Sequence, residues 1–193
     1  MVRSIALRRA AAVAAALAAL AATDAGAQQQ GQQRPILSPR DTVSLELGTG
    51  RRVYIDYGRP SMRGRRIMGG LVPYGRVWRT GANAATTLVT DVDLEIGGTQ
   101  VRRGTYTLYT IPTSQGWTLI VNRQTGQWGT QYEPARDLAR IPMQVSRLRA
   151  PVEQFTIDLE QGRAGAGTLA LEWETTRAVV PFRVAAPAAQ PRR

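Results

Sequence analysis

The 193-residue chain contains no cysteine, no histidine and no lysine. Without cysteine the chain forms no disulfide. Without histidine and cysteine it can have neither a Ser-His-Asp triad nor a Cys-His pair to provide a nucleophile. Zinc and copper sites ordinarily need imidazole or thiolate ligands, so we expect no metal site and no cofactor. Catalysis would be left to carboxylates, hydroxyls and arginines. No catalytic motif is recognisable, which favours a protein that is not an enzyme.

All 25 basic residues are arginine, and the formal net charge is +11. A GC-rich codon bias accounts for the preference over lysine without any function. Arginine nevertheless keeps its charge at every physiological pH, and its planar fork matches carboxylate and phosphate groups. An acidic partner is therefore consistent with the composition. We expect no nucleic acid partner, because most arginines are spread along the chain and the chain is expected to leave the cytoplasm.

The N-terminus has the pattern of a secretory signal peptide. The opening MVRSIALRR is basic, an alanine-rich apolar run follows over 10–22, and Ala25-Gly26-Ala27 is an A-x-A cleavage pattern. The apolar run is shorter than the ~20 residues that span a bilayer. We therefore predict export to the periplasm or the extracellular space, with 1–27 removed and no membrane anchor left.

The composition divides the rest of the chain into three parts. Residues 28–37 are polar and of low complexity, which predicts a disordered lead-in. Residues 185–193 predict a similar disordered tail. Residues 38–184 form the expected folded domain, and the sequence does not indicate its oligomeric state.

Inside this domain apolar residues recur with a period of two, which is the period of a half-buried strand. Clear examples are TVSLEL, RVYIDY, FTIDLE and TLALEW, while only PARDLAR (134–140) is a candidate helical turn. Turn residues recur about every 8–12 positions. We predict an all-β fold, a single antiparallel β-sandwich or barrel-like domain with a long Arg/Gly-rich loop covering one end.

Two positions give more detailed predictions. Gly97-Gly98 is a two-residue hairpin turn, which sets Leu94 opposite Val101 and Asp93 opposite Arg102. Pro181 interrupts the last strand pattern. Because proline donates no ladder hydrogen bond, this strand is expected at an edge of the sheet.

The predicted loop lies within RPSMRGRRIMGGLVPYGRVWRTGAN, residues 59–83, which we call the arginine–glycine segment. It holds six arginines, five glycines and no acid. Pro60 and the glycines disfavour a helix, so we expect about 18 irregular residues before pairing resumes near Val77. Long irregular loops in compact domains are usually functional or disordered, and this one carries too much apolar surface for disorder.

Two interpretations of the segment remain open. In the structural one it is a plug whose arginines bind nearby carbonyls and pair with Asp56, Asp91 or Glu133. In the functional one it is a wall of a pocket for a small anionic or carbohydrate ligand. Its candidate binding residues are then Arg59, Tyr74, Arg76, Trp78, Arg79, Thr80 and Asn83, together with Trp128, a stacking platform or a core residue of a second glycine-bearing loop.

The acidic residues give weaker hypotheses. Asp91, Asp93 and Glu95 alternate along one strand, and neighbours on one strand face stand ~6.6 Å apart, too far for a compact calcium cage. No spacing singles out a carboxylate pair for hydrolysis among Glu133, Asp137, Glu153, Glu172 and Glu174. A carboxylate-based hydrolase therefore ranks below a binding module, and below a structural or envelope protein-interaction domain.

The motifs also carry a resemblance to a known family. The run GRPSMRGRRIMGGLVPYGRVWRTGANAATT, followed by GTYTLYTIP, WTLIVN, QWG and LEWE, resembles a bacterial exported family catalogued as domain of unknown function 2911. The similarity extends over residues 38–182. The resemblance implies an exported protein, and it carries no catalytic residue, cofactor or ligand over to this chain.

Overall fold

The computed structural model describes residues 37–48 and 50–186. The expected signal peptide, nearly all of the expected lead-in and most of the expected tail lie outside these ranges. Within them the chain is almost entirely β-structure, as predicted, with one 3-10 turn, η1 (Pro134–Arg136), inside the candidate helical stretch. No helix in the described ranges is long and apolar enough to cross a membrane.

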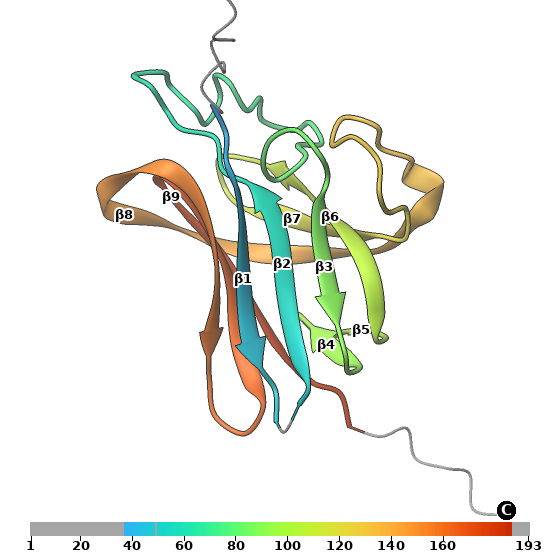
Figure 1. Cartoon of the computed structure of the whole chain (residues 1–193). Helices are drawn as coiled ribbons and strands as arrows, with labels where there is room; N and C mark the ends of the chain where they lie inside the picture. The colour runs from blue at the N-terminus through green and yellow to red at the C-terminus, as the bar shows by residue number, and fades with distance from the viewer. Residues whose placement is uncertain (1–36, 49, 187–193) are drawn as a thin grey trace, which may run out of the picture. The chain divides into compact units, whose positions relative to one another are not determined.

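Nine antiparallel strands form one sheet in the order β1-β2-β3-β6-β7-β8-β9-β4-β5 (Figure 1), and this sheet is not closed. The strands are β1 (Arg40–Glu46), β2 (Arg52–Gly58), β3 (Thr86–Thr90), β4 (Leu94–Ile96), β5 (Thr99–Val101), β6 (Gly104–Pro112), β7 (Trp117–Asn122), β8 (Asp137–Gln161) and β9 (Ala166–Val184).

The long strand β8 joins two halves of this sheet. Up to Met143 it pairs with β7, and from Gln144 to Gln161 it pairs with β9. Because β8 changes partner, the two halves of the sheet can face each other across a common core. Tyr57 of β2 shows the contact between the halves, because its hydroxyl accepts the Ile157 backbone N–H of β8 at 3.0 Å.

The core lies between the two halves and follows from the period-two pattern. Val53, Ile55 and Tyr57 of β2 are at most 1% exposed, and Leu171 and Trp173 of β9 are equally buried. One cluster of buried side chains includes residues from both halves of the sheet. The alternation predicted from the sequence therefore places its apolar side chains in one common core.

The hairpin predicted at Gly97-Gly98 is confirmed for its core pair and wrong for its outer charged pair. Leu94 lies opposite Val101 as expected. Asp93 does not pair with Arg102, since β4 begins at Leu94, and its carboxylate accepts the Arg103 backbone N–H at 2.7 Å.

Pro181 is not in an edge strand, because β9 pairs with β8 and with β4. The β8 ladder along β9 begins at the pair Gln144–Val179, so at Pro181 there is no β8 residue to accept a hydrogen bond. The proline therefore removes no ladder bond in the middle of the sheet.

Residues 59–85 connect β2 to β3 and contain no complete strand, only isolated bridges. Trp78 forms one of these bridges, with Thr110. Regular pairing resumes at Thr86 and not near Val77. Figure 1 shows this green connection at the upper end of the sheet, on the same side as the gold connection between β7 and β8.

Candidate functional site

The arginine–glycine segment is attached to both halves of the sheet by backbone hydrogen bonds. The Phe155 N–H of β8 donates to the Pro60 carbonyl at 2.9 Å. Trp78 and Thr110 of β6 exchange two bonds, of 2.7 and 2.9 Å. The segment is therefore fixed to β8 near its start and to β6 near its end.

Three glycines allow the backbone around residue 82 to pack closely. A Cβ on Gly58 would stand 2.2 Å from the Ala82 carbonyl oxygen. A Cβ on Gly129 would stand 2.8 Å from the Asn83 carbonyl oxygen and 2.8 Å from Cδ of Arg79. Gly81, with φ of 153°, lies against Thr86 and Gly58 in the same way. Any larger residue at these points would push the segment away from the sheet.

Thr80 is fully buried and has a φ of 51°, which is unusual for a β-branched residue. Its hydroxyl lies 3.1 Å from the Thr110 hydroxyl, and its carbonyl accepts the Thr86 hydroxyl at 2.7 Å. These contacts hold the turn that precedes Asn83, itself at a φ of 64°. Thr80 therefore supports the backbone of this turn, and it is not among the residues that line the pocket.

Trp78 forms part of an aromatic cluster. Its ring stacks on Trp173 at 5.8 Å between centroids and meets the edges of Phe155 at 5.0 Å and Trp117 at 6.2 Å. Trp173 and Phe155 are buried, whereas Trp78 is half-buried. The indole of Trp78 thus has one part fixed in the core and another part that reaches the surface.

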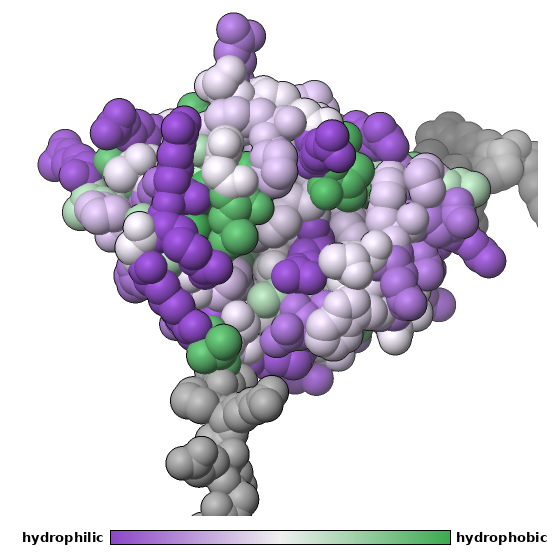
Figure 2. Space-filling view, turned by 90° about the horizontal axis from the view of Figure 1, so that it is seen from above, coloured by the Kyte–Doolittle hydropathy of each residue, from purple (hydrophilic) through white to green (hydrophobic). Residues whose placement is uncertain are grey.

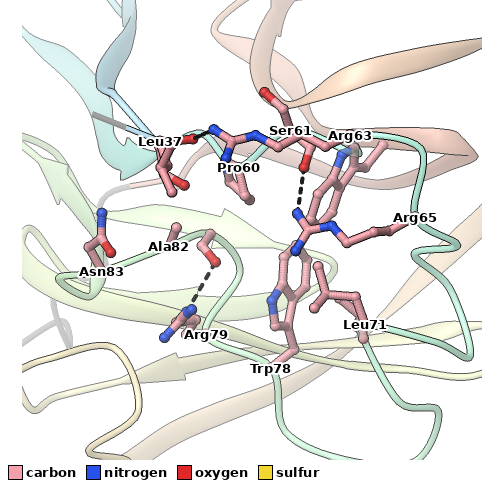
Figure 3. A pocket seen from close by; sticks show the side chains of 14 residues that line it. Leu37, Pro60, Ser61, Arg63, Arg65, Leu71, Trp78, Arg79, Ala82 and Asn83 are labelled. Atoms are coloured by element: carbon pink, nitrogen blue, oxygen red, sulfur yellow. Dashed lines mark hydrogen bonds between the residues drawn. The ribbon is translucent and has the colours of Figure 1, made fainter. Parts of the chain in front are cut away.

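A pocket of about 270 Å³ opens beside Trp78 (Figure 3). Its wall contains three arginines and no acidic residue. Apolar side chains and two tryptophans make up much of the rest. The lining residues are Leu37, Ser38, Pro60, Ser61, Arg63, Arg65, Leu71, Val72, Trp78, Arg79, Gly81, Ala82, Asn83 and Trp173.

Figure 3 shows how the side chains surround this space. Arg79 and Asn83 lie on one side and Arg65 on the other, with Trp78 below and Pro60 above. Seen from above in Figure 2, strongly hydrophilic side chains lie across a hydrophobic area of this face. The lining of the pocket itself combines three guanidinium groups with apolar side chains.

The three arginines of the pocket bond to backbone carbonyls. Arg63 donates to Leu37 at 2.7 Å, Arg65 to Ser61 at 2.8 Å, and Arg79 to Gly81 at 3.2 Å. Each guanidinium is oriented by these bonds and still has further N–H donors. In the part of the chain that the structure describes, none of the three forms an ion pair.

Two glutamates accept hydrogen bonds from the backbone of the segment. The Glu153 carboxylate accepts the N–H of Arg63 at 2.8 Å, and that of Glu174 accepts the N–H of Met68 at 3.0 Å. Neither glutamate lines the pocket. Both glutamates hold the backbone of the segment in place. The arginine side chains of the pocket therefore have no carboxylate partner among the lining residues.

Of the eight predicted site residues, the structure brings Trp78, Arg79 and Asn83 together around the pocket. Arg59 lies elsewhere, since its guanidinium pairs with Asp41 at 2.9 Å and donates to the Phe155 carbonyl at 3.1 Å. It links β1, β2 and β8. The acid partners Asp56, Asp91 and Glu133 predicted for the segment are not those that its arginines contact.

The other predicted residues are also outside the pocket lining. Tyr74 is 43% exposed and packs against Gly69, and Arg76 is exposed. Thr80 is fully buried and does not line the pocket. Trp128 is 51% exposed, so its ring is not core packing.

Sequence reasoning missed several residues of the pocket, among them Arg63, Arg65 and Trp173. The two arginines belong to the segment, but nothing in their spacing distinguishes them from Arg66 or Arg76. Trp173 lies far along the chain, on β9, and no local pattern links it to the segment.

Four of the other acids considered in the sequence pair with basic or backbone groups in separate places. Asp91 accepts the Arg52 N–H at 3.1 Å, and Glu95 pairs with Arg183 at 2.7 Å. Glu172 pairs with Arg177, and Asp137 with Arg140. Within the described ranges, no group of three or more histidine, cysteine or acidic residues could hold a metal ion.

Comparison with known proteins gives one match. Residues 38–182 match the model of the family described as "Protein of unknown function (DUF2911)". No curated protein and no solved structure matches the chain.

Proposed function

The chain belongs to the DUF2911 family, whose description names no activity, and from the geometry of the pocket we propose that it is an exported, non-enzymatic module that binds a small organic anion. The observation that carries the proposal is the pocket wall, in which three arginines occur without any carboxylate. A charged ligand would supply the counter-charge that the pocket residues do not.

The orientation of the guanidiniums supports an oxyanion. Arg65 is held by two carbonyls, those of Met62 at 2.9 Å and Ser61 at 2.8 Å. Such bonds fix the fork before a ligand arrives and lower the entropy lost on binding. Asn83 adds a side chain that both donates and accepts.

The apolar part of the wall supports an organic anion over an inorganic one. Trp78, Leu71 and Pro60 line the same space as the arginines. A cavity of ~150 Å³ holds a benzene ring, so the pocket has room for about ten to fifteen non-hydrogen atoms. A carboxylate attached to a ring fits both parts of this wall.

Thermal unfolding with a small panel of compounds tests the proposal. Benzoate, galacturonate, inorganic phosphate and glucose differ in charge and in apolar area. We expect benzoate or galacturonate to raise Tm by about 5 to 10 °C at a hundred times Kd. Glucose, which has no charge, should give a smaller shift.

Two variants locate the site. Arg65→Ala removes a pocket arginine, whereas Arg76→Ala removes the same charge from an exposed position of the same segment. We expect the ligand-induced shift to be lost in the first and kept in the second. No shift with any anion, or equal loss in both variants, would show that the pocket is not a binding site.

A further inference from the structure

Trp128 differs from the other tryptophans by its exposure. Trp128 is 51% exposed, while Trp117 and Trp173 are at most 4% exposed. The backbone beneath it is nevertheless fixed, because Trp128 forms an isolated bridge with Ala84 and its N–H donates to Oε1 of Gln131 at 3.2 Å. The chain thus presents a large apolar ring to solvent from a backbone held by hydrogen bonds.

The loop that carries this ring lies next to residues of the pocket. The next residue, Gly129, is buried, and its N–H donates to the Asn83 carbonyl at 2.9 Å. A Cβ on Gly129 would stand 2.8 Å from Cδ of Arg79. Arg79 and Asn83 line the pocket, so the loop that carries Trp128 packs against two residues of its wall. In Figure 1 the two connections lie at the same end of the sheet.

We propose that Trp128 is a second subsite of the same binding site, and that the ligand is an acidic oligosaccharide. The inference rests on the proposed function: one sugar carboxylate lies among the arginines of the pocket, and the next ring stacks on the indole. A half-exposed indole suits a sugar ring, which has an apolar face for the indole and hydroxyl groups that stay in water.

The backbone between the two subsites favours a sugar over an acidic peptide. A peptide strand crossing from Asn83 to Trp128 would need free backbone groups. Asn83 already accepts from Gly129, the Ala85 N–H donates to the Gln127 carbonyl at 3.1 Å, and Ala84 is bridged to Trp128. Recognition along this path is therefore left to side chains.

Calorimetric titration with galacturonate and trigalacturonate separates the two subsites. We expect the trimer to bind wild-type protein at least about threefold to tenfold more tightly than the monomer, from stacking on the indole. In Trp128→Ala this gain should vanish while the monomer affinity stays within about twofold of wild type. Tyr74→Ala, which removes an exposed aromatic ring outside the pocket lining, should keep the gain.

The outcomes distinguish this inference from the proposal on which it rests. A trimer that binds no more tightly than the monomer, or a gain that survives in Trp128→Ala, overturns the second subsite and leaves the pocket. If benzoate binds and galacturonate does not, the ligand is not an acidic sugar and this inference is wrong, while the proposed anion pocket stands. Tighter binding of tetraglutamate than of trigalacturonate identifies a peptide ligand and overturns the inference. If none of the anions binds to the wild-type protein, the proposed function itself is wrong.

Discussion

Thr80 shows how one residue can set the shape of the site. Its backbone is in the left-handed region, where a β-branched side chain is disfavoured, and its hydroxyl is buried against Thr110 and the Trp78 carbonyl. The polar contacts offset the cost of the conformation. The turn that they hold carries Arg79 and Asn83 to the same pocket.

Replacing Thr80 with valine tests this role, because valine keeps the β-branch and loses the hydroxyl. The Thr110 hydroxyl would lose its partner, and we expect the free energy of unfolding to fall by about 1 to 3 kcal/mol. Urea unfolding followed by fluorescence measures the change. Thr80→Ser keeps the hydroxyl and should recover most of the loss. A valine variant as stable as wild type would contradict the prediction.

Gly58 gives a second prediction at this scale. An added Cβ would lie 2.2 Å from the Ala82 carbonyl oxygen, so Gly58→Ala must displace the segment or the strand. We expect a loss of about 1 to 3 kcal/mol in unfolding free energy. Gly116→Ala is the matched control, since its Cβ would meet only the Met143 carbonyl, at 3.9 Å. Equal stability of the two variants would show that the backbone yields easily at Gly58.

Residue types alone predicted part of the site. The glycine and arginine content of the segment singled out Trp78, Arg79 and Asn83, which do line the pocket. Tyr74 and Arg76 have equally suitable chemistry and point elsewhere, because the bridge from Trp78 to Thr110 and the close packing at Gly58 decide the path of the segment. Those contacts join residues far apart in sequence, where no local pattern indicates them.

At the scale of elements, strand features set by neighbouring residues were predictable from the sequence, and pairings between distant strands were not. The hairpin from Leu94 to Val101 was predictable because its turn and both strands are adjacent in sequence. The change of partner along β8 was not, since period-two alternation is the same whichever strand lies alongside. The position of β9 between β8 and β4 follows from that change, and with it the error over Pro181.

Arg177 joins the β8–β9 ribbon across its surface. Its guanidinium binds Glu160 of β8, at 2.5 Å, and Glu172 of β9. The hydrogen bonds that Arg177 donates to Glu160, and next those to Glu172, raise the pKa of its guanidinium. Without the arginine, the two carboxylates would face each other with no cation between them.

We therefore expect Arg177→Gln to lower the free energy of unfolding by about 1 to 3 kcal/mol at low salt, and by less at 1 M salt, where the Debye length is ~3 Å. Chemical unfolding at both salt concentrations measures the difference. Arg183→Gln breaks the more exposed pair with Glu95 and should cost less. A larger loss in Arg183→Gln would contradict the central place of Arg177 in the ribbon.

At the scale of the whole molecule, the missing residue types make the alkaline behaviour simple to interpret. The chain has neither lysine nor cysteine, so tyrosine is the side-chain type whose ordinary pKa, about 10, lies in the alkaline range. Burial is the largest cause that raises the pKa of four of the six tyrosines above 10.0, namely Tyr57, Tyr106, Tyr109 and Tyr132. For Tyr132 a hydrogen bond to Asp137 adds to the increase.

These raised pKa values determine how the stability of the fold changes at alkaline pH. Near pH 10 and above, the unfolded chain releases phenol protons that the folded chain still holds, so unfolding becomes more favourable as the pH rises. The stabilisation is complete below about pH 10 and is lost as the pH passes through the raised values. Urea midpoints measured from pH 8 to 11 should therefore fall above about pH 10.

Tyr57→Phe isolates one contribution to this decline. The variant loses the hydrogen bond between its hydroxyl and the Ile157 N–H, so it should be less stable at pH 8. It also lacks one of the four shifted phenols, so its midpoint should fall less steeply than that of wild type between pH 10 and 11. A midpoint that stays constant up to pH 11 in the wild-type protein would show that the buried tyrosines reach solvent as phenolates without unfolding, and that the two halves of the sheet separate more easily than their shared core indicates.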